Sequence, residues 1–204
     1  MTDDSAIYHD GNRRLQDRFD SRRIADRLEK VTLHDRFNGS DVEFIQNSAM
    51  FFLATTDADG WPDVSYKGGL PGFVQVTGDD ELAFPCYDGN GMFKSMGNLL
   101  VNPKCGLLFI DFEGQNRMRV QGTASVNEND PLMERFRGAQ LIIRVKASRI
   151  FPNCPRYIHK MQLVEHSVYA PRAEYDPPVP DWKMMPVFHD ALPKTGPAAI
   201  ENED

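Results

Sequence analysis

Hydrophobic residues change their spacing along the chain, from a helical pattern to a strand pattern near residue 50. In residues 12–31, apolar side chains recur at helical spacing on a densely charged background. This predicts one narrow amphipathic helix that lies across the domain or its partner. The segment 40-SDVE-43 has the form of a capping box. Because Phe44 and Ile45 follow it, a short helix leading into the core is expected there.

From Met50 onward the pattern predicts strands joined by tight turns. Residues 50–56 and 61–67 flank the turn DADG and form a first hairpin. The segment GFVQV, the turn TGDD and the segment ELAF form a second hairpin. A helix over about residues 92–101 follows and ends before Pro103.

The second half of the predicted sheet begins with CGLLFIDF, an almost continuous apolar run typical of a strand that is covered on both sides. Residues 117–126 alternate cleanly between apolar and polar side chains, as a half-buried strand does. The short helix NDPLMERF and a last strand over residues 141–150 complete the pattern. Consecutive hairpins with one inserted helix predict an antiparallel barrel and not a βαβ sheet.

These patterns divide the chain into three parts. Residues 1–40 form an N-terminal helical arm and residues 41–170 a mainly β domain. Residues 171–204 form a Pro-rich arm that is expected to run extended over a surface.

Composition excludes several classes of protein. Of the 204 residues, 41% are hydrophobic and 26% are charged, as in ordinary globular proteins, and the net charge is −7. An acidic chain is a poor nucleic-acid binder, and no apolar run approaches the roughly 18 residues of a membrane span. The acidic start MTDDSAIYHDG does not have the pattern of a signal peptide, so a cytoplasmic location is expected. The three widely spaced cysteines predict neither a disulfide framework nor a zinc site.

The most distinctive polar stretch is 86-CYDGNGMFKSMGN-98. It fits neither a Walker loop, which needs Gly before the lysine, nor GxGxxG, and no βαβ unit surrounds it. Asn90 and Gly91 instead precede a helix whose free N–H groups favour an anion, and Lys94 and Ser95 lie in its first turn. An ordinary capped helix with a solvated lysine would explain this stretch equally well.

Other polar positions favour an anion site. The strand period of two places Ser65 and Lys67 on one face, and Arg117 and Arg119 share a face of a later strand. A solvated strand face would explain any one of these charges, but barrel strands can also bring cations together on a single phosphate. The histidines lack metal spacing such as HxxxH, and no GxSxG nucleophile motif is present. The sequence therefore indicates no metal ligands and no catalytic residue.

Three runs taken in order carry a family resemblance: FFLATTDADGWPDVSYKGGLPGFVQV, LAFPCYDGNGMFKSMGNLLVNPKCGLLFIDF and RMRVQGTASV. Together they resemble the pyridoxamine 5'-phosphate oxidase-like family of FMN-binding split barrels, over about residues 44–165. The later segment NCPRYIH is similar to a motif of one bacterial branch of this family. The resemblance implies a six-stranded antiparallel split β-barrel with flanking short helices, and a homodimer with FMN at the interface.

The resemblance also implies which residues contact the flavin. Ser65, Tyr66 and Lys67 fall on the strand that lines the flavin and its phosphate, and Phe84 and Pro85 fall at a strand end beside it. Further cofactor contacts are implied at Asn90, Lys94, Ser95, Asn98 and Arg117. In such dimers the partner closes the site, which makes Arg156, Tyr157 and Trp182 weaker candidates.

The sequence departs from the true oxidase at its end, which reads PAAIENED instead of the substrate motif of that enzyme. Pyridoxamine-phosphate oxidation is therefore not expected. The leading hypothesis is an FMN-dependent oxidoreductase that acts on a small organic substrate. The alternatives are a flavin-binding protein without turnover, acting as a sensor, carrier or scavenger, and a relative that binds a deazaflavin or haem.

Overall fold

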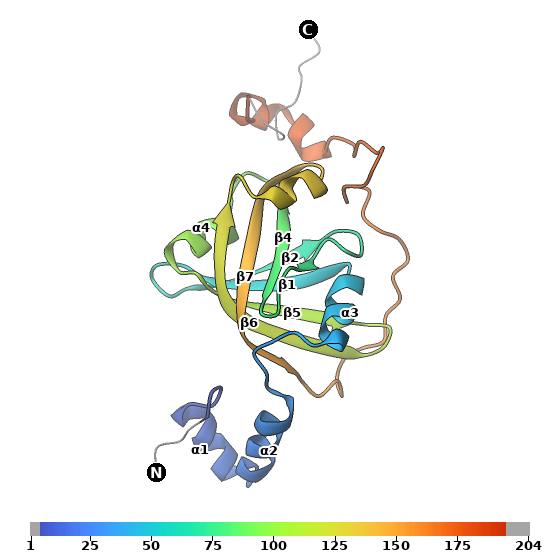
Figure 1. Cartoon of the computed structure of the whole chain (residues 1–204). Coiled ribbons are helices and arrows are strands. Elements are labelled where there is room, and N and C mark those ends of the chain that lie inside the picture. The colour runs from blue at the N-terminus through green and yellow to red at the C-terminus, as the bar shows by residue number, and fades with distance from the viewer. Residues whose placement is uncertain (1–4, 195–204) are drawn as a thin grey trace.

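Seven strands form one antiparallel sheet in the computed structural model, which describes residues 5–194 (Figure 1). The order across the sheet is β2-β1-β5-β6-β7-β4-β3. The strands are β1 (Met50–Thr56), β2 (Pro62–Gly68), β3 (Gln75–Val76), β4 (Glu81–Tyr87), β5 (Lys104–Asp111), β6 (Asn116–Asn127) and β7 (Ala139–Pro152). The sequence pattern placed most of these strands within one or two residues.

The sheet differs from the predicted six-stranded barrel in two ways. It has seven strands, and its edge strands β2 and β3 do not pair with each other in the described part of the chain, so the sheet is open. The strand expected over GFVQV is shortened to β3, because only Gln75 and Val76 pair with β4. Phe73 closes a turn instead, since its N–H donates to the carbonyl of Leu70 at 3.0 Å.

The sheet is strongly curled around an aromatic core. In Figure 1, β4 and β7 run along the molecule, whereas β1, β2 and β5 run across it. The fully buried ring of Phe51 on β1 lies 4.9 Å from that of Phe84 on β4 and 5.1 Å from that of Phe109 on β5. Because β1 and β4 are not neighbours in the sheet, the contact between Phe51 and Phe84 crosses its concave interior. Both faces of CGLLFIDF are partly covered, as its apolar pattern predicts.

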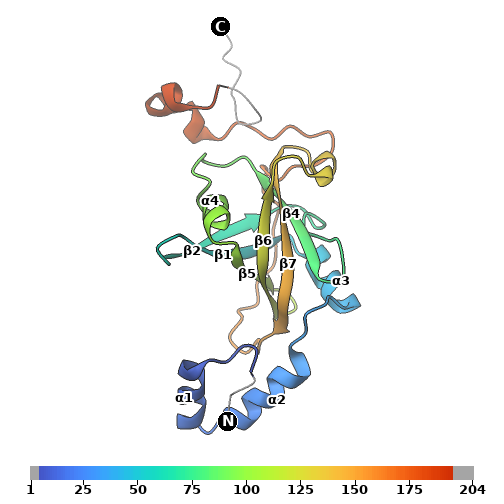
Figure 2. The same ribbon diagram turned by 60° about the vertical axis from the view of Figure 1, so that its left-hand side comes forward.

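Helices flank the sheet and form the two ends of the molecule (Figures 1 and 2). In chain order, α3 precedes β1, α4 lies between β4 and β5, and short 3-10 helices lie before β7 and in the C-terminal segment. The helices are α1 (Asp10–Arg18), α2 (Arg22–Thr32), α3 (Gly39–Asn47), α4 (Lys94–Val101), η1 (Pro131–Arg135), η2 (Asp181–Met184) and η3 (Pro186–Ala191).

Two helix predictions are corrected by the structure. In place of the single helix expected over residues 12–31, the structure has two helices that project from one end of the sheet. The helix is interrupted at Asp20, whose φ is +49°. The cap of α3 is Asn38 and not Ser40. The side chain of Asn38 accepts hydrogen bonds from the N–H groups of Ser40 and Asp41, which are otherwise unsatisfied at a helix start.

The Pro-rich C-terminal segment lies at the opposite end from α1 and α2 (Figure 2). The outermost parts of the two predicted arms, residues 1–4 and 195–204, lie outside the described residues. Within residues 5–194, no helix has the length and apolar character needed to cross a membrane.

A buried charged group joins β4, β7 and the loop before η1. The guanidinium of Arg144 donates two hydrogen bonds to Asp130, at 2.6 and 2.9 Å, and one to Glu81 at 2.7 Å. Asp130 is only 8% exposed. The hydrogen bonds from Arg144 hold the pKa of the Asp130 carboxyl below its usual value, against the opposing effect of burial.

We expect Asp130→Asn to lower the free energy of unfolding at pH 7 by about 1.5–3 kcal/mol, the range for a hydrogen bond to a charged group. Since the folded-state pKa is depressed, this stabilisation is complete above pH about 4 and is lost only as the pH falls through the lower folded-state value. Urea unfolding at pH 7 and pH 3 measures both effects. Glu128→Gln, an exposed neighbour, is the control. Equal losses for the two variants would contradict the prediction.

Candidate functional site

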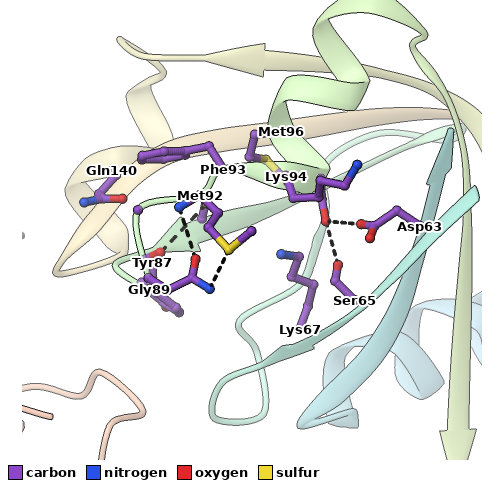
Figure 3. A pocket seen from close by; sticks show the side chains of 14 residues that line it. Asp63, Ser65, Lys67, Tyr87, Gly89, Met92, Phe93, Lys94, Met96 and Gln140 are labelled. Carbon is purple, nitrogen blue, oxygen red and sulfur yellow. Dashed lines mark hydrogen bonds between the residues drawn. The ribbon is translucent and has the colours of Figure 1, made fainter. Parts of the chain in front are cut away.

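A cavity of about 350 Å³ lies where β2 approaches the end of β4 and the start of α4 (Figure 3). The curl of the sheet creates it, because β2 is an edge strand and β4 belongs to the other half of the sheet. Its lining residues come from β2, β4, the loop between β4 and α4, α4 itself and β7. They are Asp63, Ser65, Lys67, Cys86, Tyr87, Gly89, Asn90, Gly91, Met92, Phe93, Lys94, Ser95, Met96 and Gln140.

Alternate residues of β2 supply one wall of the cavity. Asp63, Ser65 and Lys67 face the same side as the core, since Ser65 pairs with Leu53 and Lys67 with Phe51, both fully buried. The amine of Lys67 points into the middle of the cavity, as Figure 3 shows. A strand period of two therefore places one cation, one hydroxyl and one carboxylate side by side.

The N-terminus of α4 supplies the opposite wall. The N-cap residue Phe93 has left-handed backbone angles (φ +46°, ψ +28°) and no side-chain capping hydrogen bond. Left-handed backbone costs a non-glycine residue about 1–2 kcal/mol, so the surrounding structure must enforce it. The first N–H groups of a helix have no intrahelical acceptor, and they carry a partial positive charge.

The two walls are joined by hydrogen bonds between side chains. The buried Ser95 hydroxyl lies 2.8 Å from that of Ser65, and it donates to Asp63 at 3.2 Å. Figure 3 draws both contacts. Within residues 5–194, neither Lys67 nor Lys94 forms an ion pair in the structure. The cavity thus presents two lysines and two hydroxyls against a single carboxylate, which suits an anion.

The loop between β4 and α4 forms the third side. The Asn90 side chain folds back on this loop, since its Oδ1 accepts from the N–H of Met92 at 3.1 Å. Gly91 has φ +73°, a conformation that glycine adopts without strain. Asn90 therefore shapes the turn at the cavity, and its amide lies at the cavity edge.

Burial has the largest effect on the pKa values of the two titratable groups at the end of β4, Cys86 and Tyr87. It raises the pKa of the Cys86 thiol, and the nearby Lys67 ammonium partly opposes this rise. Burial also raises the pKa of Tyr87 to about 12, so this phenol stays protonated at neutral pH. Neither group provides an additional anion that would repel a negatively charged ligand.

Half of the residues expected to contact the cofactor lie together in this cavity. Ser65, Lys67, Asn90, Lys94 and Ser95 line it. Their assignment to a cofactor stays a prediction.

The other predicted residues lie elsewhere in the chain. Tyr66 points to the opposite face of β2, where its ring lies edge-on to Phe52. Phe84 and Pro85 are buried in β4. The buried Asn98 amide donates to Thr55 Oγ1 at 3.0 Å and holds α4 on the sheet.

Arg117 also lies away from the cavity. Its guanidinium donates to the carbonyl of Cys154 at 2.7 Å, near the start of NCPRYIH. Arg156 and Tyr157 belong to that segment and are exposed. Trp182 lies in the C-terminal segment, where it lines neighbouring spaces with the loop at residues 88–93.

Among the cavity residues that were not predicted to be part of a site are Asp63 and Gln140. Asp63 shares the strand face of Ser65 and Lys67, so the period of two could have identified it. Gln140 reaches the cavity because β7 pairs with β4 around Tyr87 and Ala139, a long-range contact that no local pattern indicates. Among residues 5–194, no group of three or more His, Cys, Asp and Glu residues is placed to hold a metal ion.

Comparison with known proteins identifies the family. The sequence model of the pyridoxamine 5'-phosphate oxidase family matches residues 40–164, more than half of the chain. The chain belongs to this family. The resemblance seen in its sequence is thereby confirmed. No curated protein matches the chain significantly.

Solved structures similar to the chain come from several bacteria. HupZ of Group A Streptococcus is 20% identical, with 57% of this chain and 93% of that chain covered and a TM-score of 0.46. An FMN-binding protein from Syntrophomonas wolfei is 12% identical, with 69% and 97% covered and a TM-score of 0.45. The heme storage protein HutZ from Vibrio cholerae is 22% identical, with 58% and 92% covered and a TM-score of 0.39. At these values the likenesses carry no argument about ligand or activity.

The electrostatic contact between Lys67 and Cys86 gives a test of the cavity. Lys67→Met removes the charge that lowers the pKa of the Cys86 thiol, so less thiolate forms at a given pH. We expect slower alkylation of Cys86 by iodoacetamide at pH 8.5, followed by mass spectrometry. The exposed Cys154 in the same molecule is the internal control. An unchanged alkylation rate at Cys86 would show that the Lys67 ammonium is not close enough to affect the thiol.

Proposed function

We propose that this protein binds FMN with the phosphate in the cavity between β2 and α4, and that it acts as an FMN-dependent oxidoreductase on a small organic molecule. The observation that supports this most is the meeting of Lys67, Lys94, Ser65 and Ser95 at one helix N-terminus. Family membership supports a flavin over other phosphate-bearing ligands.

The donor set fits a terminal phosphate. Each lysine offers a charged donor, each serine a hydroxyl, and the first turn of α4 offers backbone N–H groups. The Ser95 hydroxyl already bonds to Asp63, so it would exchange this contact for a phosphate oxygen. The net charge of the three ionic side chains is positive, as an anion requires.

In this proposal the bound flavin supplies the redox chemistry. The protein holds the phosphate end, keeps the Tyr87 phenol protonated and excludes water from the buried side of the cavity. We assign no general acid or base, since burial raises the pKa values of Cys86 and Tyr87 and so moves both away from neutrality.

We further propose that the protein is a homodimer that pairs through the outer face of the sheet. Val64 and Tyr66 on the edge strand β2 are 66% and 63% exposed, and they pair with Ala54 and Phe52 on β1. An apolar face on an edge strand is unusual for an isolated chain. The other side of β2 forms one wall of the cavity, which alone is at the small end of ligand pockets, so a protomer that packs at this edge strand would extend it.

The proposed dimer would also bring Arg117 close to the proposed cofactor site. Arg117 lies on the outer side of the same sheet, since it pairs with Ile110 while the alternate residue Met118 is buried. A dimer built on this face would bring Arg117 into the interface. The proposal thus accounts for its absence from the cavity of its own chain.

Lys67→Ala should weaken FMN binding by about 1.5–3 kcal/mol, or roughly 10- to 100-fold, because one charge-assisted contact to the phosphate is lost. Riboflavin, which lacks the phosphate, should lose little affinity. Lys94→Ala should act in the same direction but less strongly, since Lys94 is more exposed. Fluorescence titration of both ligands measures the effect.

Lys104→Ala, which removes an exposed lysine outside the cavity, is the control for this series. Equal losses for FMN and riboflavin would contradict the phosphate assignment. The purified protein should also be yellow and release FMN on heating. Release of a deazaflavin, or a Soret band, would contradict the choice of cofactor.

Tyr66→Glu should convert a dimer into a monomer at micromolar concentration, because it buries a charge in the proposed interface. Sedimentation velocity of the full chain measures the change. Val187→Glu, an exposed apolar residue of the C-terminal segment that lies off the sheet, should leave the mass unchanged. A monomeric mass for the unaltered protein would rule out the shared site.

A further inference from the structure

The C-terminal segment is fixed against the loop that forms the cavity. The ammonium of Lys183 is 2.5 Å from the carboxylate of Asp88, and Lys183 is only 4% exposed. A second ion pair joins Asp176 to Arg137, in the turn before β7. These contacts hold residues 176–183 beside the loop, although the segment lies beyond the residues that match the family.

A second cavity, of about 650 Å³, lies between this segment and the loop. It shares residues 89–93 and Gln140 with the first cavity, so one short loop separates the two spaces. Its apolar lining comes from both sides: Met92, Phe93, Trp182, Phe188, Leu192 and Pro193. The rings of Trp182 and Phe188 meet edge to face at 5.7 Å.

The charges that line this second cavity cancel. Its charged members are Asp88 and Lys183, which pair with each other. Its other polar side chains are the amides of Asn90 and Gln140 and the indole N–H of Trp182. The Asn90 amide already bonds within the loop, whereas the Gln140 amide can donate or accept a hydrogen bond and the indole can donate one. An ionised ligand would lose hydration here without gaining an unpaired partner of opposite charge.

We propose that this second cavity binds an uncharged aromatic small molecule, which is the substrate class of the oxidoreductase proposed above. Its volume lies within the range of small-molecule sites, and such sites combine an apolar lining with a few polar groups that fix orientation. Aromatic rings pack well against the edges and faces of Trp182, Phe188 and Phe93. The inference of a substrate rests on the proposed flavin function, whereas the binding site itself does not.

Isothermal titration calorimetry of the full chain with 2-naphthol tests the site. This probe is uncharged at pH 7, and 2-naphthoate has the same rings with a carboxylate. We expect one 2-naphthol per chain and an affinity for 2-naphthoate that is lower by about tenfold or more, because the carboxylate must be desolvated. Equal affinities, or no saturable binding of 2-naphthol, would overturn the proposal.

Two variants locate the binding. Leu192→Glu places a charge in the cavity and Ala191→Trp fills it, and each should weaken 2-naphthol by about tenfold or more. Val187→Glu adds the same charge to the same segment outside the lining and should change the affinity less than twofold. If both lining variants bind 2-naphthol normally, the probe binds elsewhere and the proposal fails.

FMN titrations of the same proteins separate this proposal from the flavin proposal. The lining variants should keep their FMN affinity, which also shows that they fold, and Lys67→Ala should keep its 2-naphthol affinity. If none of these proteins, including the unaltered chain, binds FMN but the unaltered chain still binds 2-naphthol, the flavin function and the substrate role are overturned, whereas the binding site is not. A change from dimer to monomer in Leu192→Glu, without naphthol binding to the unaltered chain, would show that a second copy covers this cavity.

Discussion

The contact of the Phe51 ring with Phe84 and Phe109 is the interaction on which the rest of the structure depends. The contact of Phe51 with Phe84 joins β1 to β4, which are separated by three other strands in the sheet, so it exists only because the sheet curls. Each aromatic pair adds about 0.5–1.5 kcal/mol beyond the burial of its area, and the burial itself contributes more. The same curl brings β2 toward the end of β4. The cavity between β2 and α4 is thus a consequence of the core, and Lys67 is the residue of β2 that pairs with Phe51.

Local sequence patterns were sufficient for much of this arrangement. The strand period put Ser65 and Lys67 on one face. The glycine-rich loop indicated a helix start near Met92, two residues before the observed start of α4 at Lys94. Both features depend on neighbours within a few residues. The same period places Tyr66 on the opposite face from Lys67, so its separation from the cavity could have been predicted. The positions of Gln140 and Arg117 could not, because they depend on strand pairing between distant segments.

The corrections to the fold have the same origin. Asp20 adopts a positive φ between α1 and α2 although the apolar spacing continues through it, and periodicity does not report backbone angles. Asn38 competes with Ser40 for the cap of α3, and both types of residue are good caps. Phenylalanine is common in strands, yet Phe73 lies in a turn, and its side chain is buried in the core. In each case a tertiary contact or a backbone angle overrides the preference of the residue.

The loop at residues 88–93 is the part of the site that the core controls least. All of its residues are exposed, and its glycines give it little conformational preference of its own. Its position is set at its two ends, by the ion pair of Asp88 with Lys183 and by the Ser95–Ser65 contact at the start of α4. The first of these contacts comes from the C-terminal segment, which the match to the family does not include. The side of the cavity that β2 and α4 form therefore depends on the shared fold, whereas the opposite side of the loop depends on the C-terminal segment.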